Sequence, residues 1–234
     1  MRTLLTIAAA GLWLSSFALR TQAEESGEWT SLFNGQNLSG WNCDESYWSV
    51  EDGAITGKTT PDHLLKGYNT FCVLADREPA NFQLRLKFRI VGGNSGIQYR
   101  SQVLDREKWI VGGYQADIDS SPTYSGINYH ERGRGILADR GQLVEIAADG
   151  SKQTTQFADK EYLQELAVKP EQWNDYLIVA RGNHLQHFIN GVLTCEVIDH
   201  QSDKAATSGV IALQAHAGPP MTVQFKDIEL RELD

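Results

Sequence analysis

Three polar side chains alternate with apolar ones in a short segment, in a pattern that could form a site for proton transfer. Gln115, Asp117 and Asp119 are separated by Ala116 and Ile118. Successive side chains of a β-strand point to opposite faces, so a strand here would place the amide and both carboxylates on one face. Such a face suits sugar binding or acid–base chemistry, and the alternative is an ordinary solvated surface.

Two other segments could contribute to the same chemistry. Glu131 and Arg134 lie in a loop interrupted by glycines, which allows a ligand to approach the backbone closely. His216 follows an apolar run and shares its parity with Gln214, and imidazole titrates near neutral pH. We predict catalytic roles for Asp117, Glu131 and His216. The alternative is a set of exposed turns and a histidine that caps a loop.

Further candidates for ligand contact are amide, guanidinium and aromatic groups. Asn94 opens a strand-like segment in which Gln98 and Arg100 share a face, beside the acidic segment if the two strands pair. Trp109 follows four charged residues, where an indole suits ligand contact, and Tyr129 could stack on a sugar ring. The predicted binding residues are Asn94, Gln98, Arg100, Trp109, Gln115, Asp119, Tyr129, Arg134 and Gln214.

The cysteines leave several arrangements open. Cys43, Cys72 and Cys195 could form one disulfide and leave one thiol, and the sequence does not choose among the three pairings. Their spacing does not indicate a metal site. Clustered carboxylates are compatible with a divalent cation such as Ca²⁺, but no D-x-D-x-D-G loop is present. We therefore predict no definite cofactor.

The N-terminal segment predicts export. A basic residue, Arg2, precedes a mostly apolar run that ends in small residues near Ala23, as in a secretory signal peptide. The apolar run is shorter than the roughly 20 residues needed to span a bilayer, so membrane insertion is not expected. We expect a signal peptide over residues 1–23, one domain over 24–234, and a periplasmic or secreted location.

The net charge of −9 limits the class of ligand. Nucleic-acid binding needs a basic surface, so an acidic chain argues against it. A neutral carbohydrate is compatible with this charge. The sequence does not indicate an oligomeric state.

Alternation and turn signals predict an all-β fold. Residues 82–90 alternate strictly between apolar and polar, which is typical of an antiparallel strand with one buried face. Hairpins are predicted around Asp52-Gly53, Gly182-Asn183 and Asn190-Gly191. Residues 160–167 have helical spacing, and a β-bulge near Asp227 would reconcile the pattern of the last strand. These elements indicate a two-sheet antiparallel sandwich or jelly roll.

Several motifs in this order resemble one known family, the 3-keto-disaccharide hydrolases. The motifs span residues 30–233 and comprise Leu32-Phe33-Asn34-Gly35, Leu38-Ser39-Gly40-Trp41, Trp48-x-Val50-x-Asp52-Gly53, Gly92-Gly93-Asn94-Ser95-Gly96, residues 112–119, Glu131-Arg132-Gly133-Arg134-Gly135, Trp173-Asn174 and His216-Ala217-Gly218-Pro219. The resemblance implies a concanavalin A-like jelly roll, exported from bacteria and acting on 3-keto-glycosides. Asn128 and His130, which flank Tyr129, depart from the family pattern and could alter specificity.

The implied reaction defines what the site must contain. A ketone at C3 of a glycoside acidifies the proton at C2, so a general base can form an enolate that expels the C1 substituent, after which water can add. The site then needs a base, a donor for the enolate oxygen and an acid for the leaving group. Asp117 is the candidate base, and His216 could protonate the leaving oxygen.

Two alternatives remain open at this point. Two acids on one strand also occur in ordinary glycosidases, but the amide of Gln115 cannot serve as a nucleophile or an acid. A non-catalytic carbohydrate-binding module could share the fold, although it has little use for so many titratable groups.

Overall fold

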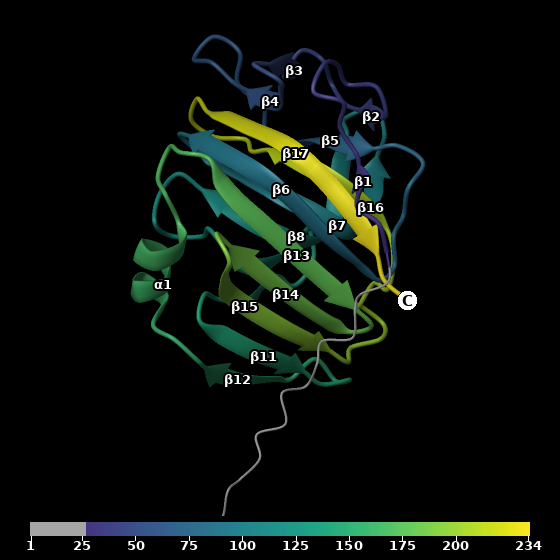
Figure 1. Ribbon diagram of the computed structural model, residues 1–234, viewed down its shortest axis with the longest axis vertical. Helices are drawn as coiled ribbons and strands as arrows, with labels where there is room; N and C mark the ends of the chain where they lie inside the picture. Colours follow the sequence, from purple (N-terminus) through teal and green to yellow (C-terminus); the bar gives the residue numbers. More distant parts are fainter. Residues whose placement is uncertain (1–26) are drawn as a thin grey trace, which may run out of the picture.

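The computed structural model describes residues 27–234, which form two packed β-sheets. The predicted signal peptide, residues 1–23, lies outside the described residues. No helix within residues 27–234 is long and apolar enough to cross a bilayer. Figure 1 shows the larger sheet in front and the smaller sheet behind it, with a short helix at one edge.

The larger sheet has ten strands in the described residues, in the order β12-β11-β15-β14-β13-β6-β17-β4-β3, with β1 paired to β17. Its strands are β1 (Thr30–Ser31), β3 (Trp48–Glu51), β4 (Ala54–Lys58), β6 (Phe82–Val91), β11 (Gln142–Ile146), β12 (Lys152–Gln156), β13 (Asn174–Arg181), β14 (His184–Ile189), β15 (Val192–Asp199) and β17 (Thr222–Glu232). All its pairs are antiparallel except β11 with β15, which are parallel.

The smaller sheet has seven strands within residues 27–234, in the order β10-β9-β8-β7-β16-β5-β2. Its strands are β2 (Trp41–Asn42), β5 (Thr70–Leu74), β7 (Asn94–Asp105), β8 (Ile110–Asp119), β9 (Asn128–Glu131), β10 (Gly135–Ala138) and β16 (Val210–Ala215). The predicted all-β sandwich is therefore confirmed, and the helix α1 (Lys160–Ala167) matches the predicted residues 160–167.

Hydrophobic alternation places the core between the sheets. In β6, Phe82, Leu84, Leu86 and Phe88 are buried, and they pack with Tyr99 and other inward side chains of the smaller sheet. Burial of these apolar faces stabilises the sandwich by about 25 cal/mol for each Å² removed from water. The face of each sheet that points away from this core is left free for polar groups.

The predicted turns and bulge are confirmed. Asp52 and Gly53 have φ of 51° and 71°, and Asn190 and Gly191 have φ of 49° and 78°, as a two-residue hairpin turn requires. Asp227 has φ of 51°, and the β17–β6 register shifts between Lys226 and Glu229. The bulge changes the parity of β17 and keeps both ends of the strand facing the core.

The structure brings two of the three cysteines together. The Sγ atoms of Cys43 and Cys72 lie 3.0 Å apart, where the chain leaves β2 beside β5. Cys195 is buried elsewhere in the core, with its Sγ atom 3.5 Å from Nδ1 of His187. Of the three pairings that the sequence leaves open, the geometry favours Cys43 with Cys72.

We expect Cys43 and Cys72 to form a disulfide when the protein is incubated with oxidised glutathione, which accepts the two electrons by thiol–disulfide exchange. The bond should raise the free energy of unfolding by about 2–4 kcal/mol, because it closes a long loop. Intact mass and denaturant unfolding with and without reductant test this. Cys43→Ser should show no reductant-dependent difference, and a bridge to Cys195 in the native protein would contradict the prediction.

Candidate active site

Strand β8 contributes to the core with one face and to a polar surface with the other. Tyr114, Ala116 and Ile118 are buried between the sheets. Gln115, Asp117 and Asp119 project from the outer face of the smaller sheet, where they line a hollow. The alternation predicted from the sequence is confirmed, and it places an amide and two carboxylates side by side.

Neighbouring strands extend this polar face. In the β7–β8 register, Asn94 faces Asp119, Gly96 faces Asp117 and Gln98 faces Gln115. A Cβ atom at Gly96 would lie 2.5 Å from Cγ of Gln115, so only glycine leaves room for that side chain. The pairing of these two strands, on which the predicted site depended, is therefore present.

A hollow of about 400 Å³ unites most of the predicted site. It brings together the three catalytic candidates, Asp117, Glu131 and His216. Its other lining residues are Asn69, Asn94, Gln115, Asp119, Tyr124, Ile127, Tyr129 and Ile136. Residues far apart in sequence thus meet on one face, as an active site requires.

Asp117 is the most buried carboxylate of the hollow, with 5% of its surface exposed. Burial raises the pKa of its carboxyl group well above the usual range, and repulsion from Glu131 and Asp119 adds to this rise. A hydrogen bond acts in the other direction: Gln115 Nε2 donates to Asp117 Oδ1, which favours the ionised form and lowers the pKa of Asp117. A carboxylate with a raised pKa is suited to accept a proton near neutral pH.

Glu131 is held by an asparagine that sequence reasoning missed. Burial raises the pKa of Glu131, and a hydrogen bond of 3.2 Å from Asn69 Nδ2 lowers it, as does the nearby charge of His216. Asn69 Oδ1 in turn accepts a 2.9 Å hydrogen bond from the backbone N–H of Ala217. Asn69 therefore positions both Glu131 and the segment carrying His216. No local sequence signal distinguishes it from an ordinary loop asparagine.

Aromatic and polar side chains form the walls. Tyr124 and Tyr129 line the hollow, and burial with the charge of Glu131 raises the pKa of the Tyr129 hydroxyl, which stays protonated as a donor. Asp119 Oδ1 accepts from the backbone N–H of Ser121 at 2.8 Å, so this carboxylate also holds the next turn. Two tyrosine rings beside carboxylates suit a sugar ring.

Five predicted binding residues do not line the hollow. Gln98 and Gln214 are fully buried one layer beneath it, where both hydrogen-bond to Gln115. Trp109 packs on the apolar cluster that contains Phe71, instead of facing a ligand. Trp109 is half-buried because the β7–β8 hairpin folds back onto β5, with Phe71 N–H donating to Trp109 O at 3.0 Å.

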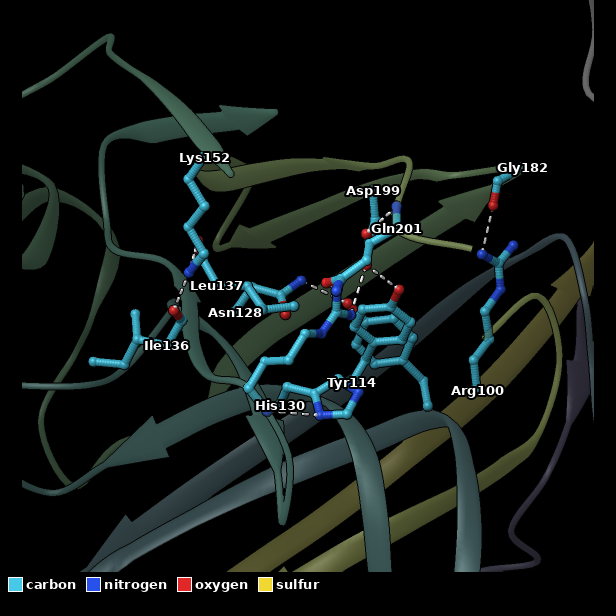
Figure 2. A network of polar contacts seen from close by, with 12 residues as sticks. Arg100, Tyr114, Asn128, His130, Ile136, Leu137, Lys152, Gly182, Asp199 and Gln201 are labelled. Atoms are coloured by element: carbon cyan, nitrogen blue, oxygen red, sulfur yellow. Dashed lines mark hydrogen bonds and ion pairs between the residues drawn. The ribbon is translucent and has the colours of Figure 1, made fainter. Parts of the chain in front are cut away.

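Arg100 does not share a site with Gln98, contrary to the prediction. It has φ of 45° in a β-bulge of β7, where the register with β8 shifts between Tyr99 and Gln102. Its guanidinium donates to the carbonyl oxygens of Ala80 at 2.7 Å and Gly182 at 2.6 Å, and Figure 2 shows the second of these bonds. The bulge removes the simple parity on which the prediction depended.

Arg134 also lies away from the hollow. Its Nη2 atom is 2.6 Å from Asp199 Oδ2, which also accepts a 2.6 Å hydrogen bond from the Tyr114 hydroxyl. Figure 2 shows the Tyr114 hydroxyl joined to Asp199. The ion pair lowers the pKa of Asp199 despite its burial. The geometry indicates that Arg134 tethers the β9–β10 turn to the larger sheet.

No group of three or more histidine, cysteine or acidic side chains in residues 27–234 is arranged to hold a metal ion. The carboxylates of the hollow therefore add no support for the divalent cation considered from the sequence. A larger hollow of about 810 Å³ lies on the outer face of the ten-stranded sheet. Its charged residues include the ion pairs Arg85–Glu229 and Lys87–Asp175, so they do not resemble an acid–base site.

The protein is a two-sheet β-sandwich with an acidic hollow on one face, and comparison with known proteins gives its family. The family model of the 3-keto-alpha-glucoside-1,2-lyase-like domain matches residues 28–231. The chain therefore belongs to this family, as its sequence motifs predicted. No curated protein matches the chain.

Solved structures support the fold. A provisionally named glycosyl hydrolase from Parabacteroides distasonis is 22% identical, with a TM-score of 0.56 over 88% of this chain and 100% of that one. A second protein of this description from the same organism is 21% identical, with a TM-score of 0.57 over 88% and 94%. The carbohydrate-binding module CBM66 from Bacillus subtilis is 12% identical, with a TM-score of 0.52 over 81% and 93%.

We expect Arg134→Met to destabilise the protein by about 3 kcal/mol, because it leaves Asp199 buried and unpaired. The pKa of Asp199 is lower in the folded than in the unfolded state, so the pair stabilises the fold above the unfolded pKa of about 3.9 and loses this effect as pH falls through the folded pKa. Denaturant unfolding between neutral and acidic pH measures both effects. If Arg134 instead binds substrate, the variant would keep its stability and lose affinity.

Proposed function

We propose that this protein cleaves 3-keto-glycosides by removing the C2 proton and eliminating the C1 substituent. The observation that carries the proposal is the convergence of Asp117, Glu131 and His216 in one hollow, in a chain of the 3-keto-alpha-glucoside-1,2-lyase-like family. Similarity to carbohydrate-acting proteins would by itself also fit a carbohydrate-binding module. The buried titratable groups favour an enzyme, because burying charge is costly and needs a function to offset it.

The reaction proceeds in two balanced steps. Asp117 takes the C2 proton, and the electrons of the C–H bond form an enolate with its charge on the C3 oxygen. The enolate then re-forms the ketone, makes the C1–C2 double bond and breaks the C1–O bond, and the departing oxygen takes a proton from an acid. Water can add to the resulting enone, so that the net reaction is hydrolysis.

The residues of the hollow supply each role. Asp117 is the base, since it is the most buried carboxylate of the hollow and burial raises its pKa, which makes the ionised form a stronger base. His216 or Glu131 protonates the leaving oxygen, because both lie in the same hollow and their charges interact. Asn94 and the Tyr129 hydroxyl are among the donors that line the hollow and could bind the enolate oxygen, in place of Arg134, which is bound to Asp199.

Export to the periplasm or the medium remains part of the proposal. It is supported by the signal-peptide pattern of residues 1–23, which the sequence alone provides. Cell fractionation of the full chain tests it.

Asp117→Asn should abolish turnover of a 3-keto-glucoside with little loss of affinity, because the amide keeps the shape but cannot take a proton. Because the folded pKa of Asp117 lies above its unfolded value, ionised Asp117 opposes folding at neutral pH, so this variant should be at least as stable as the parent. Enone absorbance and calorimetric binding of the keto sugar measure the two effects.

The unoxidised glucoside is the matched substrate control for this variant. Its hydrolysis by the wild-type protein would favour the ordinary glycosidase. Binding of both sugars without turnover would favour the carbohydrate-binding module. Full activity of Asp117→Asn would remove Asp117 from the mechanism.

The effect on kcat of removing the general acid should depend on the leaving group. We expect His216→Gln to lower kcat by about 10²-fold for a 3-keto-glycoside with an alkyl aglycone, the usual size of a general-acid effect. A nitrophenyl aglycone leaves without protonation, so its kcat should be nearly unchanged. Equal losses for both substrates would contradict the acid role, and Glu131→Gln tested in the same way would show whether Glu131 holds it.

A further inference from the structure

Three buried glutamines lie at the hollow, each on a different one of three neighbouring strands: Gln115 lines it, and Gln98 and Gln214 lie beneath Gln115. Gln115 on β8 is 2% exposed, and Gln98 on β7 and Gln214 on β16 are 0% exposed. A buried carboxamide costs free energy unless it is hydrogen-bonded. The hydrogen bonds among these three side chains therefore determine how the amides are arranged.

These bonds decide which end of the Gln115 amide faces Asp117. Gln115 Oε1 accepts from Gln98 Nε2 at 2.6 Å and from Gln214 Nε2 at 3.0 Å. Gln98 is itself oriented, because its Oε1 atom accepts from the Ser101 hydroxyl at 2.6 Å. A flipped Gln115 would place its oxygen against a carboxylate and its N–H groups against two other donors. The two neighbouring amides thus hold Gln115 with its N–H group toward Asp117.

The same arrangement distinguishes the two oxygens of Asp117. Oδ1 accepts the hydrogen bond from Gln115. Within residues 27–234, Oδ2 has no hydrogen-bond partner and is not among the buried unpaired atoms. Because Asp117 lines the hollow, Oδ2 is the oxygen available to a ligand.

We propose that Gln98 and Gln214 are positioning residues, which hold the amide of Gln115 on Asp117 Oδ1 and leave Oδ2 to take the substrate proton. The inference relies on the proposed function for the substrate and for Asp117 as the base. The arrangement of the three amides stands on the geometry alone.

The electrostatics of the hollow support this role. The titratable groups that share the hollow with Asp117 are Asp119 on its own strand, Tyr124 after β8, Tyr129 and Glu131 on β9, and His216 beyond β16. From the core side, the charge of Asp117 also acts on Tyr176. Burial, Glu131 and Asp119 raise the pKa of Asp117, and the hydrogen bond from Gln115 lowers it. Without that bond a larger fraction of Asp117 is protonated and cannot act as a base.

The test replaces each supporting amide with methionine, which has similar length but no amide donor. Gln98→Met and Gln214→Met should raise the pKa of the acidic limb of the kcat/KM profile by about one unit, a tenfold loss of rate below that limb. KM should be unchanged, and activity should recover as pH rises. The matched control is Gln224→Met, a buried strand glutamine of the other sheet that hydrogen-bonds Thr56 and Arg89.

A second measurement does not depend on turnover. The Asp117 carboxyl is titrated by carbon-13 NMR in the wild type and both variants, with Asp117→Asn to assign the signal. Unchanged titration in folded variants would overturn the positioning role, even if the protein is active. If the wild type fails to cleave the keto sugar but the titration shifts as expected, the proposed function fails and the positioning role stands. Should Gln98→Met not fold, Gln214→Met carries the test; Gln214 also hydrogen-bonds Glu131, so the Glu131 carboxyl is titrated beside that of Asp117 in this variant.

Discussion

The central constraint on this protein is the burial of the Asp117 carboxylate at the base of a hollow. A buried negative charge must be compensated, and the repulsion from two nearby carboxylates makes the requirement stricter. The compensation comes from one amide, Gln115, whose orientation depends on side chains from the two next strands. In the proposed mechanism, these amides hold one oxygen of Asp117 and leave the other free for the substrate.

Strand β8 belongs both to the hydrophobic core and to the acidic hollow. Its inward residues pack between the sheets, and its outward residues line the hollow, so the rigidity of the core is transmitted directly to the acidic face. Gly96 on β7 leaves room for Gln115, and Asn69 links Glu131 to the segment of His216. The site is therefore assembled on strands and their ends, which position groups more precisely than a long loop would.

The outlying candidates show how polar residues can serve the fold instead of a ligand. Arg134 and Asp199 form a buried ion pair between the sheets, and Arg100 bonds backbone carbonyls beside β13. Both arginines resemble binding residues in the sequence because guanidinium groups suit both purposes. Their tertiary partners decide between a binding role and a structural role. Asp199 lies 65 residues from Arg134, and Gly182 lies 82 residues from Arg100.

Local patterns determined the strands, the two-residue turns, the helix at residues 160–167 and the polar face of β8, because each depends on residues close together in the chain. The family followed from the order of its motifs. Tertiary structure alone decided that Asn69 reaches Glu131, that Cys43 meets Cys72, and that a bulge turns Arg100 away from Gln98. These outcomes depend on strand register and on how the β7–β8 hairpin folds back, and side-chain parity along a single strand carries no information about either.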